Sequence, residues 1–160
     1  MADEVKKITN ADLIVDEGEK IQYIVIQLGH ENYGIDIKYV DNIVRMQSIT
    51  RVPHVANYIK GVINLRGEVI PVLNLRLKLN LDEVEDTKDT RIIILKLEQY
   101  GLLGFIVDEV KEVVTLSEIQ IEKVAYDTTD EKQNYVFGVG KPDDRLISLL
   151  DMNAVCNESK

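Results

Sequence analysis

The sequence contains no tryptophan, two phenylalanines, two histidines and a single cysteine. With only Cys156 present, an internal disulfide is excluded, and the polar stretch around it is not typical of a thiolate metal site. No segment approaches the run of about 18 apolar residues that a membrane-spanning helix needs. The segment Met1–Lys20 alternates charges and lacks the apolar stretch of a signal peptide. These absences predict a cytoplasmic protein with no direct membrane insertion.

The residue types that most catalytic sites require are equally scarce. His30 lies in a predicted turn and His54 follows a proline, and neither has a serine or an acid at the spacing of a catalytic motif. Phosphate-binding glycine loops, nucleophile elbows and paired metal ligands are absent. Phe137–Lys141 resembles a phosphate loop only faintly, because no hydroxyl residue follows the lysine. We therefore predict a binding protein with no catalytic residue, no metal site and no cofactor.

The net charge of −9 argues against a nucleic-acid-binding protein, because phosphate contacts need clustered lysine and arginine. The segment Lys38–Lys78 is an exception, since it holds seven bases and only two acids. One interpretation is a set of solvated side chains with no common purpose. The other is a basic face that receives an acidic protein partner.

Short stretches rich in β-branched and aromatic residues predict strands. These stretches are Ile21–Leu28, Tyr33–Ile37, Gly61–Arg66 and Glu68–Leu73. Val40, Ile43 and Val44 have the spacing of one helical turn. Gly67 separates two of the strands and allows the positive φ that a tight hairpin needs. The pattern favours an all-β protein.

The chain also resembles itself when its second half is aligned with its first. One offset, without gaps, places Gly34 on Gly104 and Val40 on Val110. A slightly longer offset, further along the chain, places Gly61 on Gly138. Strand, strand, helical turn and hairpin recur in the same order in both halves. We infer a structural duplication.

We predict an all-β fold of two small SH3-like five-stranded barrels packed together, with short helical turns and a short C-terminal helix. One such barrel alone would bury only a marginal core. The predicted boundaries are a mobile tail at 1–19, a single domain at 20–152 and a polar tail at 153–160. Within the domain the barrels are assigned to 20–85 and 90–152, and an exchange of segments between them is left open.

The two copies differ at one hairpin tip. Asn64–Gly67 falls opposite Lys141–Asp144, so the barrel itself does not require Arg66. An arginine on a turn is well suited to bidentate bonds with a carboxylate or to bonds with backbone carbonyls. Loops on a rigid barrel are also common binding sites. This tip is the best candidate for a partner contact, the alternative being an arginine that only improves solubility.

The copies also differ in their first strand. Ile26 and Leu28 fall opposite Lys96 and Glu98, so one face is apolar in the first copy and polar in the second. The apolar face has to be covered, either by the other barrel or by a partner protein.

Several strings of residues resemble the CheW family of bacterial chemotaxis coupling proteins. They are Tyr33–Ile37, Ile49–Pro53, Tyr58–Gly67, Pro71–Arg76 and Gly104–Asp108. The resemblance extends from about Ile21 to Met152, and the string Ile59–Gly67 is its most specific part. The sequence departs from the usual family pattern at His54–Asn57 and at Asn74, where an aspartate is more common.

The resemblance implies two SH3-like barrels and an adaptor function. In the family, the adaptor joins the cytoplasmic tip of a chemoreceptor to the regulatory domain of the histidine kinase CheA. The receptor's helical hairpin lies in the groove between the barrels, and positions matching Val40 and Arg66 are associated with that contact. The kinase-binding residues are not assigned. The predicted receptor-binding residues are Val40, Asn64, Leu65, Arg66, Gly67, Gly104 and Val107.

Two alternatives remain open at this stage. The same kind of adaptor serves non-flagellar chemosensory pathways, and sequence alone does not separate these partner sets. A nucleic-acid-binding barrel protein is the alternative from a different class, and the net charge of −9 disfavours it. For an adaptor of either pathway we expect a cytoplasmic protein that is recruited to membrane-associated receptor arrays.

Overall fold

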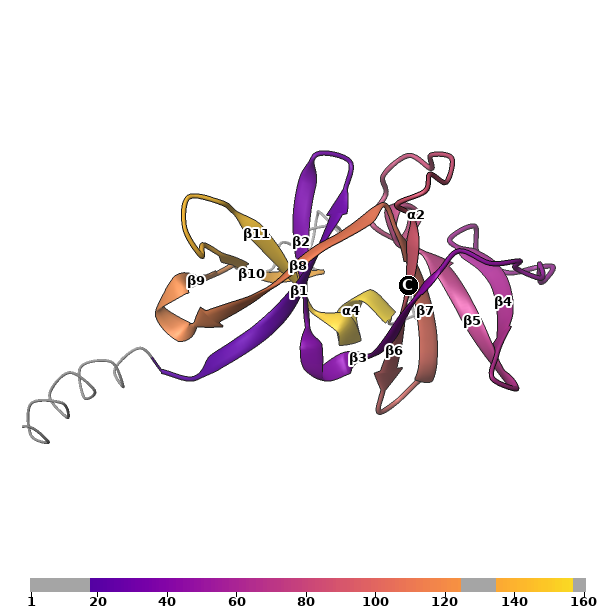
Figure 1. The fold of residues 1–160 in the computed structure, drawn as a ribbon, viewed down its shortest axis with the longest axis horizontal. Coiled ribbons are helices and arrows are strands. Elements are labelled where there is room, and N and C mark those ends of the chain that lie inside the picture. The colour runs from indigo at the N-terminus through magenta and orange to yellow at the C-terminus, as the bar shows by residue number, and fades with distance from the viewer. Residues whose placement is uncertain (1–17, 125–134, 157–160) are drawn as a thin grey trace, which may run out of the picture.

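A computed structural model describes residues 18–124 and 135–156 (Figure 1). The predicted tail at 1–19 lies outside these ranges except for its last two residues, and so does the end of the predicted C-terminal tail. Strands dominate and the helical segments are short, which confirms the all-β prediction. The elements in chain order are β1 (Lys20–Leu28), β2 (Glu31–Asp36), η1 (Ile37–Tyr39), β3 (Val40–Arg45), β4 (Ile59–Leu65), β5 (Glu68–Asn74), α2 (Leu75–Lys78), β6 (Arg91–Leu97), β7 (Gly101–Val107), β8 (Glu109–Ser117), η2 (Glu118–Gln120), β9 (Ile121–Lys123), β10 (Val136–Gly140), β11 (Ile147–Leu150) and α4 (Met152–Cys156).

The strands form two sheets. One has six strands in the order β8-β1-β2-β11-β10-β9, and the other has five in the order β3-β6-β7-β5-β4. The short 3-10 helix η2 joins the edge strands β8 and β9 of the first sheet. Residues 46–58 join the edge strands of the second, and there Thr50 forms an isolated bridge to Val62. We call the two units the six-stranded and the five-stranded barrel. The prediction of two small barrels is confirmed, with β9 as an additional short strand.

The two barrels have the same internal order. Matching β8, β1, β2, β11 and β10 to β3, β6, β7, β5 and β4 superimposes the two strand orders. Gly34 lies opposite Leu149 and Gly104 lies opposite Val72, both in parallel pairing. These two pairs are related by the same two offsets that align the sequence with itself. The register therefore supports the inferred duplication.

Each barrel takes its central hairpin from the other half of the chain. The β1–β2 hairpin pairs with β8 and β11 of the second half, and the β6–β7 hairpin pairs with β3 and β5 of the first. The predicted limits 20–85 and 90–152 therefore do not coincide with the barrels, and the exchange of segments left open above is what the structure shows. The physical reason is that β1 and β6 are apolar on both faces and have to be covered on both sides.

Alternate side chains of these hairpins enter different cores. Tyr23 and Val25 of β1 pack inside the six-stranded barrel, where burial raises the pKa of Tyr23 to about 12. Ile24, Ile26 and Leu28 face the five-stranded barrel instead and join a core that both barrels share. The last two are no more than 2% exposed, so the apolar face of the first copy is covered by the other barrel.

Equivalent side chains begin the two short helices. The Oδ1 atom of Asn74 accepts a hydrogen bond from the backbone N–H of Leu77 at 3.1 Å. At the start of α4, Oδ1 of Asp151 accepts bonds from the backbone of Asn153 and Ala154 at 3.1 and 3.2 Å. Asn74 therefore caps α2 as Asp151 caps α4.

The C-terminal helix α4 confirms the predicted short helix and includes residues 153–156 of the predicted polar tail, whose remaining residues lie outside the described ranges. Val155 and Cys156 are at most 4% exposed and belong to the shared core. Met152, Val155 and Cys156 fall on one side of the helix, and that side is buried.

Candidate functional site

The β4–β5 hairpin carries the tip that the sequence comparison selected. Leu65 pairs with Glu68, so Arg66 and Gly67 are the two turn residues. Their φ angles are +52° and +84°. Positive φ at both positions is the geometry of a type I′ turn, whose twist matches that of the flanking strands. The hairpin therefore projects Arg66 from a rigid turn.

Arg66 is an unusual residue at this position. The first turn residue of a type I′ hairpin is commonly asparagine, aspartate or glycine, because a residue with a longer side chain loses roughly 1–2 kcal/mol in the left-handed region. The side chain of Arg66 is exposed and makes no hydrogen bond or ion pair with any residue in the described ranges. Local strain without a structural benefit points to a functional role for the residue.

A pocket of about 280 Å³ opens beside the tip. Its lining combines apolar side chains from four strands with charged side chains that include Arg66. An apolar hollow with a charged rim suits the side chains of an amphipathic helix. The lining residues are Asp41, Leu65, Arg66, Glu68, Ile70, Ile94 and Leu102.

Val40 opens strand β3 and pairs with Leu95 of β6. It is partly buried against the shared core. Its neighbour Asp41 lines the tip pocket, so Val40 and the hairpin tip lie on adjoining parts of the five-stranded barrel. The structure therefore brings Val40, Asn64, Leu65, Arg66 and Gly67 into one region.

Val110 is a candidate that the sequence reasoning missed. It corresponds to Val40 in the ungapped alignment of the two halves. It lies opposite Ile26 in β8 and is likewise partly buried against the shared core. The signal was present in the internal repeat, since the same offset pairs the two valines. Each barrel thus places a valine at the border of the shared core.

Gly104 and Val107 do not lie at the surface. A Cβ atom on Gly104 would be only 2.8 Å from Cγ2 of Ile92. Val107 is 1% exposed and belongs to the shared core. In this conformation neither residue offers a side chain to a partner. We therefore assign Gly104 and Val107 a supporting role within the barrel in place of a partner contact, because both positions require close strand packing.

The basic segment Lys38–Lys78 does not form one basic face. The side chain of Arg76 is 14% exposed and Lys78 is 6% exposed, so both are turned inward. Lys60 pairs with Glu83 at 2.7 Å. The interpretation of the whole segment as a receiving face is therefore wrong for its C-terminal bases. Within the described ranges, the exposed arginines of this segment without an ion pair are Arg45, Arg51 and Arg66.

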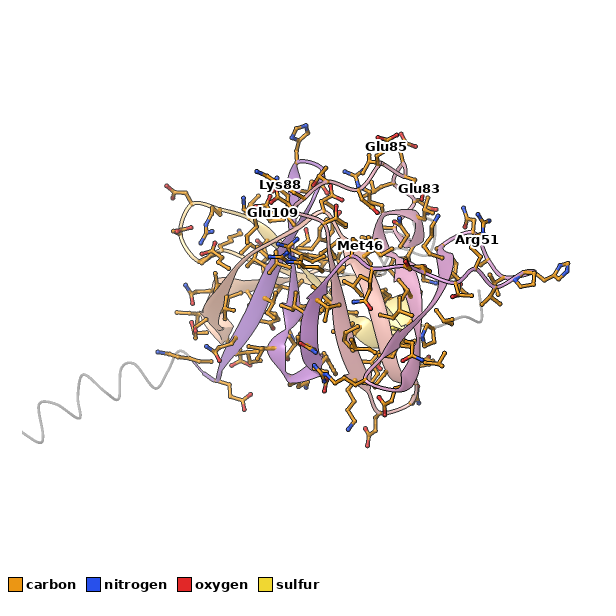
Figure 2. All side chains as sticks on the ribbon, turned by 45° about the vertical axis from the view of Figure 1, so that its right-hand side comes forward. Met46, Arg51, Glu83, Glu85, Lys88 and Glu109 are labelled. Carbon is orange, nitrogen blue, oxygen red and sulfur yellow. The ribbon has the colours of Figure 1, made fainter. Side chains whose placement is uncertain are left out.

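A second surface lies at the other end of β4. The connection before β4 exposes Val52 and Val55, at 40% and 41%, around a hollow of about 720 Å³. His54 between them has a φ of +62°. Figure 2 shows Arg51 of the same connection at the edge of the molecule. Exposed large apolar side chains around a hollow are typical of protein contact surfaces.

Neither a metal site nor a membrane span is found in the described part of the chain. No group of three or more histidine, cysteine, aspartate or glutamate side chains in residues 18–124 and 135–156 is placed to hold a metal ion. None of the helices in these ranges is long and apolar enough to cross a membrane.

Comparisons with known proteins agree on one family. The family model of the CheW-like domain matches residues 22–160. The chain is 40% identical to a chemotaxis protein CheW of Bacillus subtilis over 144 residues, which cover 90% of both chains. It is 35% identical to a chemotaxis protein CheW of Helicobacter pylori, with 88% of this chain and 84% of that one covered.

A solved structure agrees with the sequence relatives. The crystal structure of the scaffolding protein TtCheW from Thermoanaerobacter tengcongensis matches with a TM-score of 0.76 and 36% identity. The match covers 83% of this chain and 90% of that chain. Together with the exchanged double barrel and the Ile59–Gly67 string, these matches show that the chain belongs to the CheW family.

Proposed function

We propose that this protein is a chemotaxis scaffold that couples the cytoplasmic tips of chemoreceptors to the histidine kinase CheA, so that receptors control kinase activity. The observation that carries the proposal is Arg66, which is exposed, strained and without a partner among the described residues. The sequence relatives of this chain are named chemotaxis proteins, and the similar solved structure is described as a scaffolding protein. Both support the same function.

The receptor contact is assigned to the hairpin tip and the pocket beside it. The chemoreceptor tip is a helical hairpin, and an apolar pocket with a charged rim accepts one face of a helix. Arg66 then binds a carboxylate or a helix C-terminal carbonyl of the receptor. Val40, Val110 and the tip residues Asn64, Leu65 and Gly67 complete this surface. Gly104 and Val107 hold the strands behind it.

The kinase contact is assigned to the surface around Val52 and Val55. An adaptor has to hold two partners at once, and this surface lies at the opposite end of β4 from Arg66. Both surfaces belong to the five-stranded barrel, so a rigid hairpin separates them. Barrel-to-barrel contact with the kinase's regulatory domain would bury the two valines. The hydrophobic gain for each is of the order of 1 kcal/mol, because the side chains are partly covered already.

The function requires no chemistry of its own. We propose that the protein has no catalytic activity and uses no cofactor, since binding two partners accounts for the features described. It would act in the cytoplasm, where the receptor tips lie, and would be recruited to the membrane only through them.

The test is co-sedimentation with membranes that carry a chemoreceptor cytoplasmic domain, with and without CheA. The wild-type protein is expected to pellet with receptor alone and to carry CheA into the pellet. Arg66→Glu is expected to weaken receptor binding at least tenfold and to leave CheA binding unchanged. Val55→Asp is expected to do the reverse. If neither partner retains the wild-type protein at tens of micromolar, the proposal fails.

Arg145→Glu is the matched control for Arg66→Glu. It makes the same charge change on a half-exposed arginine, but at a loop of the six-stranded barrel. It is expected to bind both partners as the wild type does. Equal loss of receptor binding in both variants would show a general charge effect and contradict a specific contact by Arg66.

The same co-sedimentation assay distinguishes the partners of a flagellar pathway from those of a non-flagellar pathway. Receptors and kinases of a non-flagellar pathway would be retained in place of the flagellar ones if the chain serves such a pathway. A nucleic-acid-binding function predicts salt-sensitive binding to DNA or RNA, and the net charge of −9 disfavours it.

A further inference from the structure

The short helix α2 holds two basic side chains that are both withdrawn from solvent. Arg76 has a side chain 14% exposed, and Lys78 is 6% exposed. Burying two cations in one turn of helix is unfavourable unless each finds good partners. Their partners therefore indicate what the helix is for.

Arg76 binds the residue at which the chain passes between the barrels. Its Nε and Nη2 atoms donate to the two carboxylate oxygens of Asp108 at 2.9 and 2.6 Å. Asp108 is the single residue between β7 of the five-stranded barrel and β8 of the six-stranded barrel. The same carboxylate accepts a bond from the backbone N–H of Gly29, in the β1–β2 turn, at 2.8 Å. One carboxylate thus connects α2 to a turn of the six-stranded barrel.

Lys78 lies between two equivalent tyrosines. Its Nζ atom is 4.2 Å from the ring centroid of Tyr58 and 5.7 Å from that of Tyr135. The backbone carbonyl of Tyr58 accepts from Asn74 at 2.7 Å, and that of Tyr135 accepts from Asp151 at 2.8 Å. Tyr58 precedes β4 and Tyr135 precedes β10, so the ammonium faces one ring from each barrel.

The aligned helix of the second copy does not carry these two cations. In the alignment that places Gly61 on Gly138, Arg76 corresponds to Asn153 and Lys78 to Val155. Val155 is fully buried in the shared core, and α4 contains no charged residue. Helix α2 therefore makes polar contacts of defined direction that reach the other barrel. Helix α4 contributes apolar packing, which has no preferred direction.

We propose that Arg76 and Lys78 form an inter-barrel brace, which fixes the orientation of the six-stranded barrel relative to the five-stranded barrel. Apolar packing alone allows small rotations, because it is insensitive to direction, whereas the bidentate pair and the two ring contacts have defined geometry. The consequence for signalling rests on the proposed function: the brace keeps the two partner surfaces in a constant relation to the rest of the scaffold.

The brace is tested on the free protein by residual dipolar couplings of backbone amides. In the wild type, one alignment tensor is expected to fit the strands of both barrels. In the double variant Arg76→Gln with Lys78→Met, the barrels are expected to need separate alignment tensors. The degree of alignment of one barrel should be at least 1.5-fold lower than that of the other. A single tensor that still fits both barrels in the double variant would overturn the proposal.

Arg145→Gln is the matched control. It removes an arginine whose ion pairs, with Glu112 and Asp143, lie within the six-stranded barrel. One tensor is expected to fit this variant, and separate tensors here would also contradict the proposal. If the double variant does not fold, Lys78→Met alone serves the test, because methionine fills a similar volume and removes only the charge.

A second measurement separates this inference from the proposed function. In a reconstituted assembly, the brace variant is expected to bind receptor and kinase within twofold of the wild type and to lose most receptor control of the kinase. Full receptor control with separated tensors would refute the link to signalling. If the wild type fails to join the partners at all, the proposed function fails while the tensor result stands by itself.

Discussion

Gly34 and Gly104 occupy equivalent places in the two barrels. Each lies in the second strand of a central hairpin and faces a parallel strand from the other half of the chain. A Cβ atom would lie 2.8 Å from Cδ2 of Leu149 at the first site and 2.8 Å from Cγ2 of Ile92 at the second. Gly34 therefore leaves room for a side chain of β11 from the other half of the chain, whereas Gly104 leaves room for a side chain of β6 in its own hairpin.

We expect Gly104→Ala to destabilise the protein more than Gly34→Ala. The Cγ2 atom of Ile92 is attached to a branched Cβ in a buried strand and has little freedom to move, whereas Cδ2 of Leu149 lies at the end of a flexible side chain. Overpacking at these sites is expected to lower the free energy of unfolding by roughly 2 kcal/mol and 1 kcal/mol respectively. Urea denaturation measures both values. The reverse order would contradict this account of the packing.

We expect Arg66→Asn to stabilise the fold and weaken receptor binding. Asparagine is favoured at the first position of a type I′ turn, so the free energy of unfolding should rise by about 0.5–1 kcal/mol. That corresponds to a melting temperature about 1–4 °C higher, measured by calorimetry. Gly67→Ala is the control, because it should lower stability through its backbone φ of +84° alone. An unchanged or lower melting temperature for Arg66→Asn would show that the arginine supports the turn.

We expect the contribution of Asp108 to stability to disappear in acid. The hydrogen bond from Arg76 and that from the Gly29 N–H hold the pKa of this carboxyl below its usual range, although partial burial opposes them. A folded-state pKa below the unfolded value of about 3.9 means that the stabilisation is complete above that pH. It is lost as the pH falls through the lower folded-state value.

The measurement compares wild type with Asp108→Asn by urea denaturation between pH 3 and 7. Above about pH 5 the variant should be less stable by roughly 1–2 kcal/mol, as for a partly buried charged hydrogen bond. The difference should shrink below about pH 4. Asp86→Asn is the control, because no hydrogen bond or ion pair links that carboxylate to another described residue. A difference that stays constant across the range would contradict the assignment.

We expect Cys156 to react slowly with a thiol reagent in the native protein and quickly in denaturant. It is 4% exposed and packs in the shared core. Reaction then requires α4 to separate from the barrels, so its rate reports local opening. Absorbance with an aromatic disulfide reagent follows the reaction. A native rate within tenfold of the denatured rate would show that α4 does not stay packed.

Much of the fold was predictable from local pattern. The β-branched runs located β1, β2, β4 and β5, and Gly67 located the hairpin, because these features depend on neighbouring residues alone. The helical turn predicted from the spacing of Val40, Ile43 and Val44 was wrong, because these residues form strand β3 and pair with β6. The internal repeat was also visible, since paired glycines and apolar residues recur in the same order in both halves. Arg66 could be singled out by comparing the copies, because a residue absent from one copy is not needed by both barrels.

Two features could not be read locally. Gly104 and Val107 were assigned to a contact surface and are buried. Arg76 and Lys78 were counted with a basic face and instead point inward to Asp108 and the tyrosine rings. In each case a side chain's exposure depends on residues far along the chain, and the spacing of neighbours carries no information about them.

The sequence by itself determined four strands of the first half, the β4–β5 turn, the repeat and the family string at Ile59–Gly67. Tertiary structure alone decided that each central hairpin belongs to the barrel of the other half, and hence that α2 reaches across to Asp108. The physical reason is that the residue pattern of β1 and β6 shows that both faces of each strand are apolar. It does not show which other strands cover those faces. That choice is made by long-range packing, where one shared core buries more apolar surface than two separate ones.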